Sequence, residues 1–212
     1  ADAFTLCDQA FCSSLTGTTP NRLYLWTGTI RSEPSQRAKA NVRNEDIDYG
    51  SEAHWTTFPE RLEDLGVSWR IYQNELSLAS GLEGESDAWL SNFTDSPIEW
   101  FSQYHVRFSA SHRAYLVTQE SVLTSELRRL ESLPQPGPKE LQQRDSTRHD
   151  LEQVRKDRST FTAEAYQLLS ERTRRLHEKA FSTNVGDPNY RELISFDYNS
   201  AGSSQTMRVP KG

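Results

Sequence analysis

The chain has 212 residues, of which 34% are hydrophobic and 25% are charged, so it can build one hydrophobic core, with or without an appendage. Its formal net charge of -6 argues against a general nucleic-acid binder, because the binding faces of such proteins are basic. No apolar run is long enough to cross a bilayer, so we expect no transmembrane segment.

The first informative stretch is a turn that leads into a helix. Gly17 and a run of hydroxyl residues precede Pro20, and the apolar run 23–26 follows. This order predicts a helix over 20–29, with Thr18 or Thr19 as the N-cap and Pro20 at the first helical position. A hydroxyl at a helix N-terminus lies near unpaired backbone N–H groups, where a phosphoryl group can be held. An ordinary capped helix is the other interpretation of the same pattern.

The next predicted elements are a long loop, a helix and a strand. Residues 30–53 are polar and lack periodicity, which indicates a loop. A helix is expected to start at Thr56–Thr57 and to end at Gly66. Its expected apolar stripe is Phe58, Leu62 and Leu65. The alternating segment 67–72 is expected to be a strand, and a helix followed by a strand is the unit of an α/β sheet.

Residues 75–94 are polar and are expected to be irregular. A short amphipathic helix is expected to begin at Ser96–Pro97 and to carry Ile98, Trp100, Phe101 and Tyr104.

Two long helical segments are expected next. The first runs from Leu116, with Leu123, Leu127 and Leu130 as its apolar positions, and the proline-rich segment 134–138 ends it. The second, 139–181, is highly charged and has few apolar positions, which favours a projecting helical pair.

The end of the chain is expected to hold a turn at 184–189, an extended segment at 193–198 and a polar loop at 199–204. These patterns divide the chain into an α/β portion (1–115), a helical-hairpin insertion (116–183) and a segment that returns to the α/β core (184–212).

Other residues that could carry chemistry give weaker signals. Cys7 and Cys12 are five residues apart and are expected to be structural, reduced or half-buried thiols, since a mutual disulfide would need a bend between them. Asp8 is a candidate supporting group for the Thr18 turn, or an ordinary loop residue. The histidines show no metal-ligand spacing, and those at 149 and 177 are expected to be solvated. Six aromatic residues are expected to be core residues, with a cleft that binds a choline-like group by cation–π contact as the less favoured interpretation. They are Trp55, Trp69, Tyr72, Trp89, Trp100 and Tyr104.

The Thr18 turn resembles a known catalytic motif. Thr18-x-Pro20-Asn21-Arg22 is similar to the nucleophile turn of the alkaline-phosphatase superfamily. A second block, 55–62 followed by 66–69, resembles the bacterial phospholipase C and acid phosphatase family of phosphoesterases. The resemblance is clear over residues 1–76 and returns weakly near 190–212.

This resemblance implies a fold, a reaction and a site. The fold would be part of an alkaline-phosphatase-like α/β sandwich with a charged helical-hairpin insertion. Thr18 would be the nucleophile and a contact to a divalent metal ion, Asn21 would bind phosphate, and Arg22 would offer a guanidinium. Attack of the Thr18 Oγ on phosphorus, followed by hydrolysis of the phosphothreonine by metal-bound water, would cleave a phosphodiester such as a phospholipid head-group linkage. The resemblance also implies a periplasmic or secreted location.

Part of the expected site is missing from the sequence. The acidic metal ligands of the family are not found on either side of Thr18. We therefore expect the chain to be a segment of a longer polypeptide, which would supply most metal ligands, and we expect the segment alone to be inactive. Two alternatives remain: an acid phosphatase that acts on phosphomonoesters, and a non-catalytic module in which the helices of 116–181 bind a partner.

Overall fold

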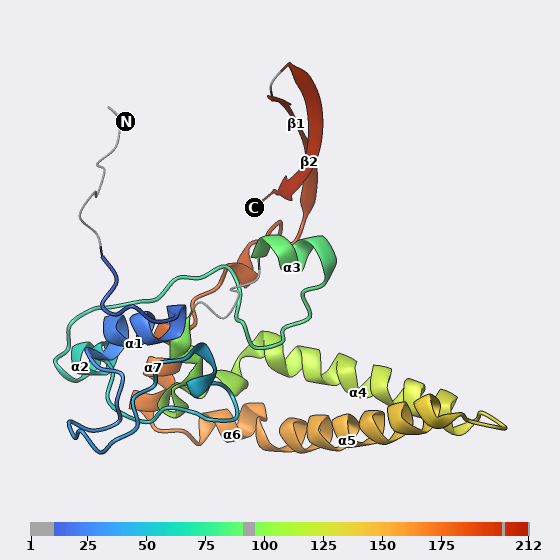
Figure 1. Cartoon of the computed structure of the whole chain (residues 1–212), viewed down its shortest axis with the longest axis horizontal. Coiled ribbons are helices and arrows are strands. Elements are labelled where there is room, and N and C mark those ends of the chain that lie inside the picture. The colour runs from blue at the N-terminus through green and yellow to red at the C-terminus, as the bar shows by residue number, and fades with distance from the viewer. Residues whose placement is uncertain (1–10, 91–95, 201, 212) are drawn as a thin grey trace. The chain divides into compact units, whose positions relative to one another are not determined.

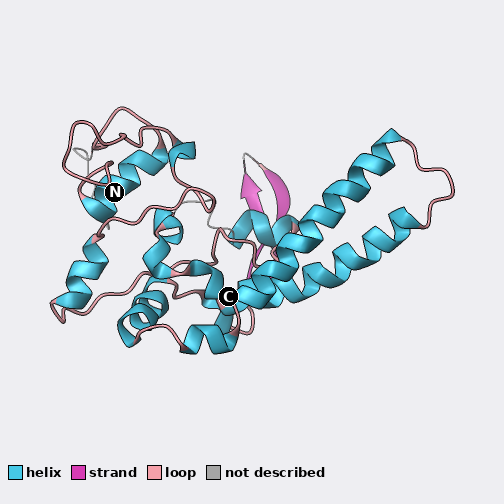
Figure 2. Cartoon of the chain, turned by 90° about the horizontal axis from the view of Figure 1, so that it is seen from below, coloured by secondary structure: helices cyan, strands magenta, loops and turns pink. Residues whose placement is uncertain are grey.

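The computed structural model describes residues 11–90, 96–200 and 202–211. The chain divides into two compact units, one formed by residues 1–69 and 95–103 and the other by residues 70–94 and 104–212. Helices and 3-10 turns alternate with long loops, and the strands in the described ranges form a two-stranded sheet (Figures 1 and 2). The structure is therefore mixed helix and strand. No helix in the described ranges is long and apolar enough to span a membrane.

The first unit holds α1 (Thr18–Thr27), α2 (Phe58–Asp64) and the 3-10 turns η1 (Asn44–Asp46) and η2 (Pro97–Trp100). Its buried apolar residues come from α1, the long loop and the segment around η2: Leu23, Ile47, Ala53, Ile98, Trp100 and Phe101. The backbone N–H of Ala53 donates to the Trp100 carbonyl at 2.8 Å, and the N–H of Ser102 donates to the Ala53 carbonyl at 2.9 Å. The predicted loop over 30–53 is confirmed apart from η1, and these two bonds anchor its end.

The helix at Thr57 was predicted correctly, but its apolar stripe was not. Thr57 is the N-cap, and both its backbone N–H and its hydroxyl donate to Glu60 Oε2. Glu60 also accepts a 2.8 Å hydrogen bond from Gln103 and is buried. Because this carboxylate occupies the inward position, Phe58 and Leu65 are exposed.

The segment that leads from the first unit into the second was wrongly predicted as a strand. Residues 67–72 do not form a strand in the structure; Tyr72 makes a single bridge to Ser182. The N–H of Ile71 donates to the Lys179 carbonyl at 2.9 Å, and that of Gln73 donates to the Ser182 carbonyl at 3.0 Å. The side chains of this segment thus alternate between its two sides. In the described ranges, however, no neighbouring strand pairs with the segment to make it part of a sheet.

The rest of the second unit is built from helices and 3-10 turns. The turns are η3 (Ser102–Tyr104), which begins in the first unit, then η4 (Val106–Phe108) and η5 (Asn184–Gly186). The helices are α3 (Gly84–Leu90), α4 (Ala110–Glu131), α5 (Pro138–Thr160), α6 (Ala163–Gln167) and α7 (Glu171–Ala180). The amphipathic segment 97–104 is therefore 3-10 turns and not an α-helix.

Three expectations for these helices need correction. The segment 75–94, expected to be irregular, contains α3. Helix α4 starts at Ala110, six residues before the expected start at Leu116. The apolar pattern did not reveal the first turns of the helix, because the inward position there is occupied by the polar His112, which is buried. The charged run 139–181 is three helices, and the caps of α6 and α7 at Thr162 and Ser170 mark the breaks.

Helices α4 and α5 pack side by side as a hairpin, with Pro134–Pro138 at its turn (Figure 1). Leu116, Leu130 and Leu151 are buried in the second unit. Ion pairs link the two helices: Glu120 accepts from Arg155 at 3.0 Å and from Arg158, and Arg148 pairs with Glu131 at 3.0 Å. The pKa of Glu120 is lowered, and the hydrogen bond from Arg155 is the largest cause.

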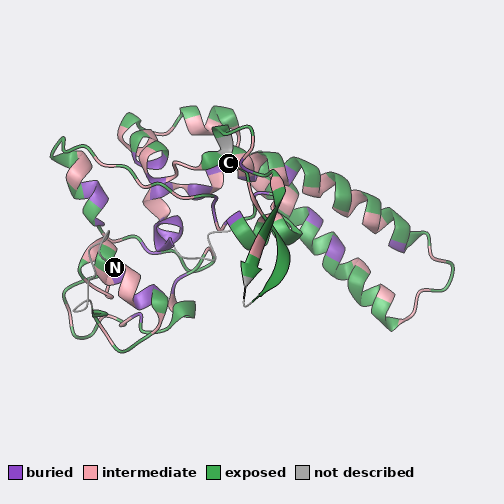
Figure 3. Cartoon of the chain, turned by 90° about the horizontal axis from the view of Figure 1, so that it is seen from above, coloured by how far each residue is buried: buried purple, intermediate pink, exposed green. Residues whose placement is uncertain are grey.

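The chain ends in the hairpin of β1 (Leu193–Ser200) and β2 (Ser203–Pro210). The strands are antiparallel, and their register pairs Ile194 with Val209 and Phe196 with Met207. The predicted strand at 193–198 is confirmed, but the segment 199–204 is mostly strand and not a loop, because Gly202 makes the reversal with φ +82°. Most of the hairpin is exposed (Figure 3).

The second unit contains two buried histidines, His112 and His177. His112 Nδ1 lies 2.8 Å from the Ala79 carbonyl and His177 Nδ1 lies 3.0 Å from the Tyr104 carbonyl, so each of these nitrogens must donate. His112 Nε2 is buried and has no hydrogen-bond partner among the described residues. Burial lowers the pKa of both rings. The expectation that His177 is solvated was therefore wrong.

We expect the free energy of unfolding to fall as the pH drops below about 6.5, the ordinary histidine pKa. Both pKa values are lowered in the folded state, so the unfolded chain binds more protons in this range and acid favours it. Urea unfolding at pH 7.5 and 5.5 measures the effect. The His112→Gln variant should lose less stability between these pH values than the wild type, and His149→Gln, at an exposed position of α5, is the control. Equal losses in the wild type and His112→Gln would contradict this account.

Candidate functional site

The candidate site is the turn at the start of α1. Gly17 is the N-cap with extended backbone, Thr18 is the first helical residue, and Pro20 is the third. The expectation that Thr18 or Thr19 caps the helix was therefore wrong. Proline still lies in the first turn, where a backbone N–H has no intrahelical acceptor, so it fits here without a lost hydrogen bond.

A side chain from the long loop caps the helix instead. Asn44 Oδ1 accepts a 3.0 Å hydrogen bond from the backbone N–H of Thr19. Gly17 makes room for it, because a Cβ at residue 17 would lie 2.3 Å from Asn44 Oδ1. Sequence reasoning missed Asn44, which is 25 residues from Thr19 and differs in no visible way from the other polar residues of its loop.

Asn21 braces the turn from its other side. Its amide nitrogen donates to the carbonyls of Ser14 at 3.1 Å and Gly17 at 3.0 Å, and its Oδ1 accepts from the N–H of Ser14 at 2.9 Å. Both amide hydrogens are thus used within the turn. A contact from Asn21 to a phosphoryl oxygen would require one of these bonds to be exchanged.

Thr18 and Arg22 lie on one face of the helix with Asn21, because they are separated by three and four residues. The Thr18 side chain is exposed, whereas Arg22 and Asn21 are half-buried. The N-terminal end of α1 carries no acidic residue in its first turn. The helix dipole there is not offset by a neighbouring carboxylate of the same turn, so the end favours an anion.

Two hollows lie at the other end of α1. One, of about 570 Å³, is lined by Tyr24, Leu25, Thr57, Phe58 and Arg61, among others. The second, of about 440 Å³, is lined by residues that include Thr29, Arg31, His54 and Trp55. A ten-residue helix is about 15 Å long. His54 therefore lies near the C-terminal end of α1 and not beside Thr18.

The remaining candidates do not gather around the turn. Asp8 and Cys7 lie outside the described residues, and Cys12 is an exposed free thiol. Trp100 and Tyr104 are core residues of the first and second unit respectively. Trp100 packs edge-on against Tyr49 with ring centroids 6.2 Å apart. In the described ranges no three His, Cys, Asp or Glu side chains come together as a metal site.

Replacing Gly17 with alanine should destabilise the turn by about 1 kcal/mol, the usual value of an N-cap. The new methyl group would displace Asn44 Oδ1 and leave the N–H of Thr19 without this acceptor. Urea unfolding measures the loss, and Gly186→Ala, where an added Cβ meets nothing within 4 Å, is the control. If the effect acts through Asn44, the Gly17→Ala/Asn44→Ala double variant should be no less stable than Asn44→Ala alone.

Comparison with known proteins places these residues in a family. A model of the Phosphoesterase family matches residues 1–136, which include α1, α2 and α4. A non-hemolytic phospholipase C of Burkholderia pseudomallei is 38% identical over 107 residues, covering 49% of this chain and 15% of that protein. A non-hemolytic phospholipase C of Pseudomonas aeruginosa is 39% identical over 108 residues, covering 49% of this chain and 13% of that protein. Phospholipase C B of Mycobacterium tuberculosis is 45% identical over 76 residues, covering 36% of this chain and 14% of that protein.

Proposed function

The chain belongs to the Phosphoesterase family, and from that premise we propose that it is the nucleophile-bearing part of an enzyme that hydrolyses phosphoric esters. The alignments span only about a seventh of the relatives' length, so the activity of the whole protein is part of the proposal. The proposed substrate is a phosphodiester such as a phospholipid head-group linkage, which the names of the matching phospholipases C support. The observation that carries the proposal is the exposed Thr18 side chain at the first position of α1.

The turn favours attack by the Thr18 Oγ on phosphorus. The oxygen would lose its proton to solvent and form a bond to phosphorus while the bond to the leaving alkoxide breaks, and the alkoxide takes up a proton. Thr18 would then carry the phosphoryl group with the remaining ester substituent of the substrate, and water would hydrolyse the bond to Thr18 in a second step. The N-terminal end of α1 would stabilise the negative charge on the phosphoryl oxygens. Arg22, one helical turn further on the same face, is the proposed cation for the same oxygens. Asn21 would bind phosphate only if it gave up a bond to Ser14 or Gly17.

A divalent metal ion is the proposed cofactor, with Thr18 as its contact in this chain. The described residues do not fit such an ion on their own, because no group of three suitable side chains surrounds it. The remaining ligands would have to come from elsewhere, and we assign no step of the reaction to the metal. The 212-residue chain alone is accordingly expected to show no phosphodiesterase activity, with or without added divalent metal.

Trapping of the phosphorylated chain tests the proposal. The longest natural polypeptide that carries these residues is mixed with a phosphodiester, quenched in acid within one turnover and digested for mass spectrometry. We expect the peptide that contains Thr18 to gain one phosphoryl group that still carries the remaining ester substituent of the substrate, and the Thr18→Ala variant to gain none. Phosphate on another residue, or metal-dependent activity of the 212-residue chain alone, would show that the site lies elsewhere.

The proposed location of the enzyme also rests on the family resemblance. A periplasmic or secreted location is proposed, and it would place the enzyme with extracellular phospholipids.

The comparison of kcat/KM for a phosphodiester and a phosphomonoester separates a phospholipase C from an acid phosphatase. The α4–α5 hairpin remains a candidate partner-binding element, since α5 lies beyond the matched residues.

A further inference from the structure

The two peptide groups that flank Thr18 are each held by an asparagine side chain. The Gly17 carbonyl, in the peptide group before Thr18, accepts a 3.0 Å hydrogen bond from Asn21 Nδ2. The N–H of Thr19, in the peptide group after Thr18, donates to Asn44 Oδ1 at 3.0 Å. Because peptide groups are planar, the orientations of these two groups define the φ and ψ angles of Thr18. The two side chains therefore act together on the backbone of a single residue.

Asn44 supplies a cap that the helix does not supply for itself. The N-cap residue Gly17 has no side chain that could accept a hydrogen bond from the first turn. Pro20 has no N–H, so the N–H groups of the first turn of α1 are those of Thr18 and Thr19. Without Asn44, the N–H of Thr19 would lose its acceptor within the protein, and the end of the helix would fray more easily.

The segment that carries Asn44 is itself braced. Asp46 Oδ2 accepts hydrogen bonds from the backbone N–H groups of Val42 at 2.8 Å and Arg43 at 2.9 Å. Lys39 Nζ lies 2.8 Å from Asp46 Oδ1, and its hydrogen bond is the largest cause that lowers the pKa of this carboxyl. The Asn44 side chain is thus presented to α1 from a closed turn within the long loop.

The contact between Asn44 and the turn is close. A Cβ at residue 17 would lie 2.3 Å from Asn44 Oδ1, 3.0 Å from its Cγ and 3.3 Å from its Nδ2. The whole carboxamide group therefore lies against residue 17, directly before Thr18. At the start of the same segment, the backbone N–H and the Nδ2 of buried Asn41 both donate to the Ile30 carbonyl, at 3.0 Å and 2.9 Å. The segment 39–46 is consequently tied both to the start of α1 and to the chain that leaves its end.

We infer that Asn44 is a positioning residue for the Thr18 nucleophile, and that the segment 39–46 serves the reaction by presenting it. This inference rests on the proposed function, because it takes Thr18 as the group that attacks phosphorus. By fixing the backbone of residue 18, the bond from Thr19 to Asn44 limits the directions in which the Thr18 Oγ can point. A nucleophile held in the reactive direction reacts faster than one that must find it anew at each encounter. The effect of Asn44 therefore belongs to the rate of transfer to Thr18 and not to the affinity for substrate.

Pre-steady-state kinetics of the longest natural polypeptide that carries these residues test the inference. The substrate is bis(4-nitrophenyl) phosphate, and the release of the first 4-nitrophenolate reports transfer to Thr18. We expect Asn44→Ala to lower the rate constant at saturation by about tenfold or more, with a change in KM of no more than about twofold. Asn44→Asp keeps an oxygen that accepts the N–H of Thr19, so it should recover most of the rate, and its negative charge should appear in KM for the anionic substrate.

A second variant disturbs the same contact from the other side. Gly17→Ala should lower the same rate constant, because its Cβ displaces Asn44 Oδ1. The Gly17→Ala/Asn44→Ala double variant should be no slower than Asn44→Ala alone. Asn184→Ala, which removes an exposed asparagine pair in the second unit, is the matched control and should leave the rate unchanged. Each variant is assayed well below its unfolding midpoint, so that the rates compare folded proteins.

Hydrogen exchange in the 212-residue chain checks the contact without any turnover. The amide of Thr19 should exchange at least about fivefold faster in Asn44→Ala than in the wild type, because it loses its acceptor. Equal exchange of this amide in the two chains would overturn the inference.

The kinetic outcomes separate this inference from the proposed function. Loss of transfer in Thr18→Ala together with a wild-type rate in Asn44→Ala would overturn the positioning role and leave the nucleophile in place. A change confined to KM in Asn44→Ala would also overturn it, because it would indicate a contact with substrate. Transfer by Thr18→Ala at the wild-type rate would overturn the proposed function and this inference with it.

Discussion

Replacing Thr18 with alanine is expected to lower phosphodiester turnover by about 10³-fold or more, the order of loss seen when a nucleophile is removed. The reason is that the alanine has no oxygen to attack phosphorus. The turn that positions residue 18 keeps its hydrogen bonds, one donated by Asn21 to the Gly17 carbonyl and one accepted by Asn44 from the N–H of Thr19. Steady-state kinetics on the longest natural polypeptide that carries the chain measure the loss. Thr18→Ser, which keeps a hydroxyl, should retain far more activity than the alanine variant.

The unfolding midpoint separates this chemical effect from a structural one. The Thr18 side chain is exposed, so its removal should change stability by no more than about 0.5 kcal/mol. Thr118→Ala, at an exposed position of α4, is the matched control for the loss of one threonine hydroxyl. Turnover by Thr18→Ala at the wild-type rate would refute the assignment of the nucleophile.

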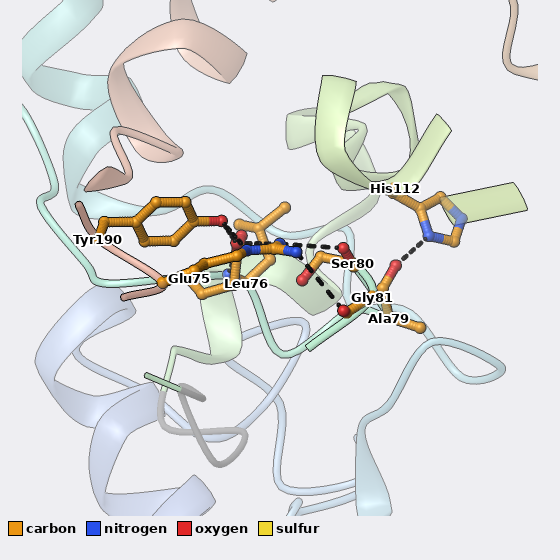
Figure 4. Close-up of polar contacts among 8 residues, drawn as sticks. Glu75, Leu76, Ala79, Ser80, Gly81, His112 and Tyr190 are labelled. Atoms are coloured by element: carbon orange, nitrogen blue, oxygen red, sulfur yellow. Dashed lines mark hydrogen bonds and ion pairs between the residues drawn. The ribbon is translucent and has the colours of Figure 1, made fainter. Parts of the chain in front are cut away.

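Replacing Arg191 with alanine is expected to destabilise the chain by about 2–4 kcal/mol, somewhat less than the loss of a partner from a fully buried ion pair because Arg191 is partly exposed. Glu75 is fully buried, and Arg191 Nη2 lies 3.3 Å from its Oε2. The variant would leave the carboxylate with the Tyr190 hydroxyl and the N–H of Leu76 as donors (Figure 4). It would also free the Ser80 and Gly81 carbonyls. Urea unfolding measures the change.

A second substitution tests the reason for this loss. Glu75→Gln in the Arg191→Ala background removes the buried charge and should restore part of the stability. Arg129→Ala breaks an exposed pair with Glu126 and should destabilise the chain far less than Arg191→Ala, because solvent screens an exposed pair. If Arg191→Ala cost no more than Arg129→Ala, the buried pair would not hold the loop that carries Ser80 and Gly81.

Local signals predicted the elements that depend on neighbouring residues. The capping box at Thr57, the break at 134–138 and the strand that begins at Leu193 follow from residues within a few positions of one another. The Thr18 motif was likewise visible, although its role stays a prediction. The alkaline-phosphatase-like sandwich remains a proposal beyond the mixed helix-and-strand structure described.

Long-range contacts explain what the sequence did not reveal. Asn44 caps α1 from 25 residues away, and Arg191 reaches Glu75 across 116 residues, so neither pairing leaves a local pattern. Buried polar residues caused the other errors. His112 and Glu60 occupy inward positions that an apolar residue would have marked, and this displaced the expected start of α4 and the expected stripe of α2.

The terminal hairpin has a consequence for the behaviour of the chain in solution. One face of the sheet carries Ile194, Phe196 and Met207, each with 38% or more of its surface exposed. In the described ranges these strands pair only with each other, and unpaired strand edges are templates for association. The net charge of -6 is then a main source of colloidal repulsion between copies. Solubility should be lowest near pH 5.4, the isoelectric point, where this repulsion vanishes while the apolar face remains.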